Sequence, residues 1–461
     1  MRRKFKHQQF ISAIEMGVFQ LHLRLLLLGG CSLFSIMASA LDDPFPSTYK
    51  PLSSPDRVIK GATVLTGTGM PLSNRFVLLK AGRIHLVDQI DGNPEVIDGT
   101  GKWLTPGIID VHSHLGDYAA PGVASLSDGN ESTEPNTAQV WAEHSVWPQD
   151  PQFPLALAGG VTTLQILPGS ANLFGGRGVT LKNVPSRTTQ GMKFPHAPYS
   201  LKMACGENPK RVYGGKEQAP STRMGNVAGY RSAWIAAQDY KKKLASDEPP
   251  MRDLKLETLM GVLDGEILVH NHCYRADEMA TMIDISKEFG YKITAFHHAI
   301  ESYKVADLLA REGICSAMWA DWWGFKLEAF DGIPEDIALV EKAGACAIVH
   351  SDSARGIQRL NQEAAKALAA GQRLGMDLNA AIAMRWLTLN PAKALGIDGE
   401  TGSIEEGKAA DLVLWDGDPF SVYSHAEKVF IDGHLYYDRL DPTRQPVSDF
   451  DLDQTPQGGA R

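Results

Sequence analysis

Two kinds of hydrophobic pattern divide the chain. Short runs in which apolar and polar residues alternate occupy residues 57–96, as in RFVLLKAGRIHLV, and return near the C-terminus in ADLVLWDGDP and EKVFIDGHLYY. Alternation with a period of two, interrupted by Gly and Asn, predicts antiparallel strands joined by tight turns. The two ends of the chain are therefore expected to form one small β domain, split around the middle of the sequence.

The middle of the chain has a different pattern, in which apolar, β-rich runs alternate with helical stretches such as ADEMATMIDISKEF. The eight runs are IIDVHSH, VTTLQIL, GVTLK, SLKMAC, EILVHNH, KITAFHH, ICSAMW and AIVHSDS. This alternation predicts βα units and a parallel sheet, and eight strands predict a closed, TIM-like (β/α)8 barrel of the α/β class. Residues 214–250 end in the charged KKKLASDEPP, and we expect an irregular insertion there, a flap or surface excursion.

The first 40 residues have the features of an export signal. Five basic residues precede the apolar run Leu25–Met37, which is followed by the small-residue sequence ASA. This arrangement predicts a signal peptide over 1–40, cleaved on export to the periplasm or the medium, with no integral membrane span in the mature chain. The alternatives are an uncleaved anchor and a lipoprotein with Cys31 as the lipid acceptor, and Met16 is an alternative start.

Composition narrows the class of protein. Apolar residues make up 43% of the chain and charged residues 21%, which is typical of a globular protein with a large core. Loss of the leader removes five basic residues and one acidic residue, so the formal net charge changes from −9 to −13. A nucleic-acid binder would usually be basic, and this balance argues against nucleic acid and anionic surfaces as partners.

Cysteine usage excludes two small-domain classes. The five cysteines include no CxxC pair, which excludes a disulfide-dense scaffold and a zinc ribbon. The four beyond the leader lie in apolar, strand-like runs, which favours buried thiols, although export would permit bridges. These four are Cys205, Cys273, Cys315 and Cys346.

Histidines and carboxylates gather where the predicted barrel strands end. His112 and His114 form an H-x-H on the first strand, and a period of two places both side chains on one face, within reach of one cation at about 2.0–2.1 Å. The same spacing recurs at His270 and His272 on the fifth strand. The further candidates are Glu207 after the fourth strand, His298 at the end of the sixth and Asp352 at the end of the eighth.

The spacing of these candidates supports a common site. His270 and His298 are 28 residues apart, about one βα unit, and His298 and Asp352 are 54 apart, about two. His114 and Glu207 are 93 apart, about three units. Every candidate then falls at the carboxyl end of a barrel strand, where enzymes of this fold place their sites. The pattern predicts a metal centre.

Three motifs resemble those of the amidohydrolase superfamily of metal-dependent hydrolases. LTPGIIDVHSHLG resembles its first-strand motif, ALAGGVTTLQ its second strand, and LNPAKALGIDGETGSIEEGKAADLVLWDGDPF its C-terminal signature. The likeness covers roughly 57–440 and is weakest over 214–250. Within the superfamily, the chain resembles the imidazolonepropionase-like and prolidase-like branches. The resemblance implies a barrel plus a small β-sandwich built from both chain ends. The sandwich is expected to consist of residues 41–105 and 391–461, the second of which includes a tail. The barrel is expected to consist of residues 106–390.

The resemblance also implies roles for the ligands. His112 and His114 resemble the ligands of the more buried metal, His270 and His298 those of a second metal, and Asp352 a ligand that doubles as proton shuttle. His272 shares a strand face with His270, and the family commonly uses the first histidine of such a pair. His297 and His298 are adjacent and point to opposite faces, and the family pattern favours His298.

The bridging ligand is where the chain departs from many relatives, which use a carbamylated lysine on the fourth strand. This chain offers Lys202 within the strand and Glu207 just beyond it, in SLKMACGENPKRVYG. A carboxylate provides two hard oxygens without carbamylation, so we prefer Glu207, with Lys202 as the rival. If neither bridges, the site is mononuclear.

These ligand types suit one or two divalent metal ions, zinc first, with iron, manganese or nickel as alternatives. Such a cation lowers the pKa of a bound water toward about 7, and Asp352 would act as base and then as acid. His272, or His350 two residues before Asp352, would stabilise the developing oxyanion.

Substrate recognition is less visible in the sequence. Arg177, Arg223 and Arg355 lie in or near strand-end loops, and an arginine fork would suit a substrate carboxylate. Trp319, Trp322 and Trp323 follow the seventh strand and could wall an apolar pocket.

The function expected first is hydrolysis of a C–N bond other than a peptide bond, in a small molecule such as a cyclic amide or amidine. The alternative is a dipeptidase or N-acyl-amino-acid hydrolase (deacetylase) of the same superfamily, and a remote one is a non-catalytic binding relative. Fold-level analogy is a weak guide to substrate, and the sequence leaves open whether the chain forms a homo-oligomer.

Overall fold

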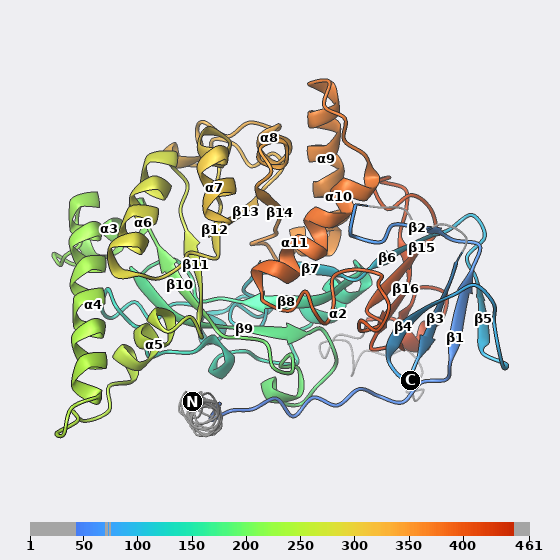
Figure 1. Ribbon diagram of the computed structural model, residues 1–461, viewed down its shortest axis with the longest axis horizontal. Coiled ribbons are helices and arrows are strands. Elements are labelled where there is room, and N and C mark those ends of the chain that lie inside the picture. Colours follow the sequence, from blue (N-terminus) through green and yellow to red (C-terminus); the bar gives the residue numbers. More distant parts are fainter. Residues whose placement is uncertain (1–42, 70–71, 73–74, 447–461) are drawn as a thin grey trace, which may run out of the picture. The chain divides into compact units, whose positions relative to one another are not determined.

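The computed structural model describes residues 43–69, 72 and 75–446, and the elements below all lie in the compact unit that begins at Pro46. The predicted signal peptide over 1–40, with Cys31, and the end of the tail lie outside the described residues. Three sheets, of four, eight and five strands, organise this unit (Figure 1). Among the described helices, none combines the length and the apolar character needed to cross a membrane.

The eight-stranded sheet contains all eight strands that the hydrophobic pattern predicts, paired in chain order. They are β7 (Ile108–Ser113), β8 (Val161–Ile166), β9 (Phe174–Lys182), β10 (Ser200–Ala204), β11 (Leu268–His272), β12 (Ala295–His297), β13 (Cys315–Met318) and β14 (Cys346–Val349). The outer strands β7 and β14 meet through their ends: Asp352 N donates to the His112 carbonyl at 3.0 Å, and Ser351 N to Asp110 Oδ1 at 3.2 Å. The barrel prediction is confirmed in this nearly closed form.

Strand β9 differs from the expected all-parallel order. It runs antiparallel to both β8 and β10, with Thr163 opposite Lys182 and Ser200 opposite Gly178. Only residues 167–173 connect β8 to β9, too few for the crossover of a dozen or more residues that parallel neighbours require. The length of this connection therefore makes β8 and β9 a hairpin.

Helices cover the outside of the parallel part of the barrel (Figure 1). They are α2 (Gln152–Ala158), α3 (Glu207–Gly214), α4 (Arg223–Leu244), α5 (Leu254–Leu263), α6 (Ala276–Phe289), α7 (Ala306–Glu312), α8 (Asp336–Lys342), α9 (Leu360–Arg373), α10 (Ala380–Leu387) and α11 (Leu389–Ala394). The sequence predicted an irregular insertion over 214–250, and this prediction is wrong. The Thr222 side chain caps α4 by accepting from Gly225 N, and its Tyr230, Trp234 and Ala237 are buried at helical spacing.

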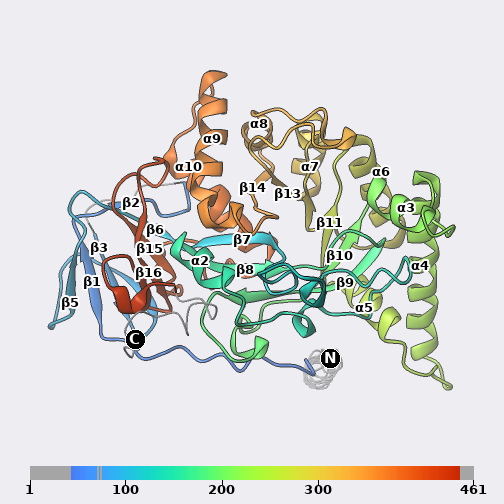
Figure 2. The ribbon, with the colours of Figure 1, turned by 180° about the vertical axis from the view of Figure 1, so that it is seen from behind.

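The split β domain consists of the two smaller sheets, of order β4-β3-β1-β5 and β17-β16-β15-β6-β2. Their strands are β1 (Arg57–Lys60), β2 (Thr63–Val64), β3 (Phe76–Lys80), β4 (Arg83–Val87), β5 (Glu95–Asp98), β6 (Trp103–Pro106), β15 (Leu412–Trp415), β16 (Ala426–Ile431) and β17 (His434–Asp438). Residues from both chain ends share one core, in which Ile59, Leu79 and Leu104 meet Leu412 and Phe430. Figure 2 shows the N-terminal and C-terminal strands side by side. The expected sandwich is present, with two parallel pairings, β1 with β5 and β2 with β6.

The four cysteines beyond the leader form two disulfides, which corrects the prediction of buried thiols. Cys205 and Cys273 directly follow the paired strands β10 and β11, with their Cα atoms 5.2 Å apart. Cys315 and Cys346 lie opposite each other at the start of β13 and β14, with their Cα atoms 4.4 Å apart. Pairing of neighbouring strands creates both contacts, and the sequence around each cysteine does not reveal which cysteine will lie opposite.

Candidate metal centre

A cavity of about 440 Å³ opens at the carboxyl ends of β7, β10, β11, β12 and β14. The residues around its floor that carry metal-binding or acid–base chemistry are His112, His114, Lys202, His272, His298 and Asp352. Several elements therefore bring candidates far apart in the sequence to one place. This is the end of the barrel that the sequence predicted for the site.

Three imidazoles converge on the carboxylate of Asp352. The Nε2 atoms of His112 and His114 lie 3.3 Å apart, and Asp352 Oδ1 is 3.6 Å from the first and 3.2 Å from the second. Asp352 Oδ2 is 3.7 Å from His298 Nε2. Each of the three rings thus turns the same nitrogen toward one small space.

The opposite nitrogens of these rings are held by the protein. His114 Nδ1 lies 2.8 Å from the Leu167 carbonyl oxygen, His112 Nδ1 lies 2.9 Å from His297 Nδ1, and His298 Nδ1 lies 2.8 Å from His350 Nε2. Metal-binding histidines are usually oriented in this way, by a partner on the nitrogen that faces away from the ion. Burial lowers the pKa of His112 and of His298 well below its ordinary range, so both rings are neutral with a lone pair to offer.

Two of these residues have a left-handed backbone. His298 has φ 55° directly after β12, and Asp352 has φ 48° three residues after β14. Left-handed backbone is unfavourable for side chains other than Gly and, to a lesser degree, Asn and Asp, and it persists where the surrounding structure holds it. At both strand ends the chain turns sharply and directs a candidate ligand into the cavity.

The structure places His272, and not His270, at the cavity, which corrects the preference for the first histidine of the pair. His270 is fully buried below the cavity, where its Nδ1 lies 2.8 Å from His297 Nε2 and its Nε2 lies 3.0 Å from the Ala394 carbonyl oxygen. Burial lowers its pKa to about 3. His272 lines the cavity with Nε2 3.4 Å from Asn208 Nδ2. His298 is at the cavity and His297 is in the core, in agreement with the preference for His298.

Lys202 and Glu207, the rivals for the bridging position, both line the cavity but at different depths. Lys202 is 1% exposed on β10; its Nζ donates to the Pro168 carbonyl at 3.0 Å and lies 3.4 Å from His112 Nε2. Burial lowers the pKa of Lys202 to about 7. The Glu207 side chain is 29% exposed on α3 and lies 3.7 Å from Lys326 Nζ. Lys202 therefore lies against the histidine cluster, whereas the sequence analysis ranked Glu207 first.

The donor set fits a divalent metal ion. Two triads bring their ligand atoms within 4.8 Å of one another: His112, His114 and Asp352, and His112, His298 and His350. Imidazole nitrogen with carboxylate oxygen is a donor set typical of zinc and its transition-metal neighbours. His350 joins one triad, whereas the sequence suggested it for oxyanion stabilisation.

The three arginines proposed from the sequence lie in three different environments. Arg177 is on β9, with Nε donating to Thr258 Oγ1 at 2.9 Å and its guanidinium 4.1 Å above the Trp141 ring. Arg223 pairs with Glu278 at 3.1 Å and also with Glu328. Neither of these two lines the cavity. Arg355 lines a neighbouring cavity beside Asp352.

Sequence reasoning missed seven polar residues that line the cavity: Tyr118, Asn130, Ser170, Asn208, Arg211, Tyr274 and Lys326. Lys326 Nζ lies 3.7 Å from the centre of the Tyr274 ring and 3.4 Å from Glu328 Oε2. Asn208 and Arg211 follow Glu207 on α3, so position after a barrel strand could have identified them. Lys326 lies in the long segment between β13 and α8, where no periodic pattern points to it.

Comparison with known proteins agrees with this architecture. The Amidohydrolase family matches residues 103–436. Amidohydrolase tasK of Hapsidospora irregularis is 33% identical over 395 residues, which cover 78% of this chain and 40% of tasK, so the chain spans about two fifths of that protein's length. Imidazolonepropionase of Legionella pneumophila (strain Corby) is 24% identical over 407 residues, covering 78% of this chain and 92% of that protein.

A solved structure, the amidohydrolase from Thermotoga maritima MSB8, superposes with a TM-score of 0.77 at 38% identity, covering 83% of this chain and 100% of that chain. The family match spans the barrel and the C-terminal strands of the sandwich, and it includes every candidate ligand at the cavity. The resemblance drawn from the three motifs is confirmed. The chain belongs to the amidohydrolase family.

Proposed function

We propose that the chain is a metal-dependent hydrolase that uses water to cleave a C–N bond other than a peptide bond, in a small molecule such as a cyclic amide or amidine. One observation carries the proposal. The Nε2 atoms of His112, His114 and His298 converge on the Asp352 carboxylate, while each Nδ1 is held by another group. This arrangement supports their assignment as a ligand set oriented for an ion.

His112, His114 and Asp352 would hold one divalent cation, and His298 with Lys202 or His272 would contribute to a second. We propose zinc, with iron, manganese or nickel as alternatives that the same donors accept. A bound cation of this kind supplies a water of lowered pKa and polarises the substrate carbonyl.

Asp352 is the proposed acid–base residue. Its two carboxylate oxygens lie between His114 and His298, where one oxygen can take a proton and later deliver it to the departing nitrogen. His272 is the proposed stabiliser of the developing oxyanion, because it lines the same cavity and its buried Nδ1 has no hydrogen-bond partner among the described residues.

The alternative, a dipeptidase or N-acyl-amino-acid hydrolase, is favoured by the cations at the rim. Lys326 lines the cavity beside Tyr274, and the exposed Arg211 makes no ion pair among the described residues. Either group could receive a substrate carboxylate. A panel of cyclic amides, N-acyl amino acids and dipeptides, each tested as acid and as methyl ester, would separate the two substrate classes.

We also propose that the mature chain works outside the cytoplasm. The two disulfides support this location, because disulfides persist in oxidising compartments. N-terminal sequencing of the protein recovered from the periplasm or the medium would test it.

Metal analysis of the purified protein tests the hydrolase proposal first. We expect one or two equivalents of a transition metal, lost with a chelator together with activity and restored by adding the metal back. Asp352→Asn should keep the fold and lower turnover by about 10²–10⁴-fold. The matched control is Asp284→Asn, an exposed carboxylate on α6. A fully active Asp352→Asn enzyme, or an active protein free of transition metal, would refute the proposal.

A further inference from the structure

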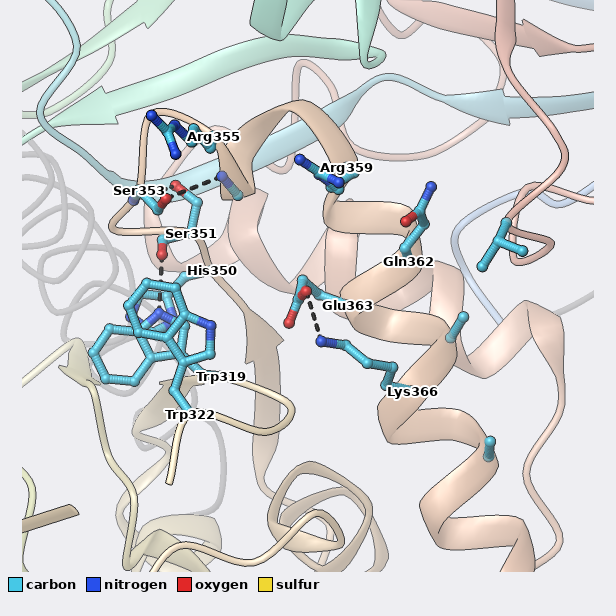
Figure 3. Close-up of a pocket in the computed structure, with 14 residues that line it drawn as sticks. Trp319, Trp322, His350, Ser351, Ser353, Arg355, Arg359, Gln362, Glu363 and Lys366 are labelled. Atoms are coloured by element: carbon cyan, nitrogen blue, oxygen red, sulfur yellow. Dashed lines mark hydrogen bonds and ion pairs between the residues drawn. The ribbon is translucent and has the colours of Figure 1, made fainter. Parts of the chain in front are cut away.

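A second cavity, of about 600 Å³, lies beside the metal centre and has a different chemistry (Figure 3). It is lined by the segment after β14, by α9 and by two tryptophans that follow β13. Asp352 faces the metal-centre cavity, whereas its neighbours Ser351 and Ser353 line this one. The two cavities therefore share a wall one chain segment thick.

Stacked aromatic rings form one side of the second cavity. Trp322 stacks on Trp319 with ring centres 4.7 Å apart and planes 12° apart. Trp319 is buried, donates from its indole N–H to the Ser351 carbonyl at 2.9 Å and stacks on His298 at 4.5 Å. Trp322 remains 37% exposed and offers aromatic surface to a ligand, and Trp319 holds it in place from behind.

Two guanidinium groups lie at one end of the cavity, four residues apart on the turn that follows Asp352 (Figure 3). Among the described residues, neither Arg355 nor Arg359 makes an ion pair or a side-chain hydrogen bond. The third cation of the cavity, Lys366, is different, because its Nζ lies 2.8 Å from both Glu363 and Asp321. The two arginines are the groups available to an anion.

We propose that this cavity is a second binding site, for a planar aromatic carboxylate. The ring would stack on Trp322, and the carboxylate would lie between Arg355 and Arg359. A planar guanidinium matches carboxylate geometry, and aromatic surfaces favour stacked rings. This binding does not depend on the hydrolytic reaction and can be measured without turnover.

Calorimetry with indole-3-acetate tests the chemistry of the site on the metal-containing protein. Indole-3-acetamide removes the charge and keeps the ring. We expect the acetamide to bind about tenfold or more weakly than the acid. Equal affinity of the acid and the amide, or no binding of the acid, would overturn the proposal.

Variants locate the site. Arg355→Gln with Arg359→Gln should weaken indole-3-acetate binding by about tenfold or more, and Trp322→Leu by about two- to tenfold. The matched control is Arg373→Gln, an exposed arginine at the far end of α9, about 20 Å along the helix from Arg359. Unchanged affinity in the double variant, or an equal loss in Arg373→Gln, would overturn the assignment.

The metal centre is the competing location, because carboxylates also bind metal ions. Asp352→Asn alters that centre and leaves the lining of the second cavity intact. We expect its affinity for indole-3-acetate to stay within about twofold of wild type. Loss of binding in Asp352→Asn, with binding retained in the Arg355→Gln/Arg359→Gln variant, would place the ligand at the metal and overturn the proposal.

Discussion

The two H-x-H pairs of this barrel have the same spacing, but they place different numbers of histidines at the metal-centre cavity. On β7, His112 and His114 both reach the metal-centre cavity, because the second of them lies just beyond the end of the strand. On β11, both histidines lie within the strand, and only His272 reaches the cavity. His270 lies two residues earlier in the strand, in the core, where its two ring nitrogens lie against His297 and the Ala394 carbonyl.

The difference shows that spacing determines the face and the strand end determines the depth. A period of two places both members of a pair on one side of a strand, and this holds for both pairs. Each step of two residues also moves a side chain by about 6–7 Å along the strand, enough to take it from the cavity into the packed core. An identical motif can thus supply two ligands or one ligand and one core histidine.

The largest effect is expected from removing a proposed metal ligand at the end of β7. His114→Ala removes one of the converging Nε2 atoms, so we expect most of the metal to be lost and turnover to fall by at least about 10³-fold. The free energy of unfolding of the metal-free protein should change little. Metal content and steady-state rates check this, with His425→Ala on the exposed surface as control. Full metal content in His114→Ala would contradict the ligand assignment.

The disulfide next to the β11 pair gives the second comparison. Replacing Cys205 and Cys273 by Ala should lower the free energy of unfolding by about 2–5 kcal/mol, as should replacing Cys315 and Cys346. Only the first pair adjoins cavity residues, since Cys273 directly follows His272, so only its loss should also lower turnover. Denaturant unfolding and activity assays on both double variants check this. Equal losses of turnover in the two would break the distinction.

Within β11, we expect variants of the two histidines to separate an effect on stability from an effect on activity. His270→Leu leaves the Ala394 carbonyl and His297 Nε2 without a partner, which should cost about 1–3 kcal/mol of unfolding free energy for each group, with metal content unchanged. His272→Leu should instead lower activity and change stability little. Denaturant unfolding and metal analysis of both variants test the contrast, and loss of metal in His270→Leu would restore its original assignment as a ligand.

The last comparison concerns the pH dependence of stability. Burial holds the pKa of His270 at about 3, whereas in the unfolded chain it is about 6.5. Between these values the unfolded chain binds a proton that the folded chain does not, so His270 makes stability fall as the pH drops, by up to about 1.4 kcal/mol per pH unit. Denaturant unfolding from pH 4 to 8 should show a shallower acid slope in His270→Leu than in wild type, and the same slope above about pH 7. An unchanged slope would show that His270 is protonated in the folded protein.

Prediction from the sequence succeeded where the signal was local. The apolar, β-rich runs located all eight barrel strands, and the positions of His112, His114, His298 and Asp352 at the ends of those strands indicated the cavity that contains them. Prediction from the sequence failed where the outcome depends on neighbours distant in the sequence. The pairing of Cys205 with Cys273 and the depth of His270 both follow from strand register, which no local pattern encodes.

The sequence by itself determined the order of strands, the split β domain and the family, because hydrophobic periodicity and motif spacing are properties of contiguous residues. Tertiary structure alone decided the different depths of Lys202 and Glu207 and the second cavity around Arg355 and Trp322. Each of these depends on how deep a side chain lies and what packs against it. Those distances are set only when separate segments of the chain come together in the folded barrel.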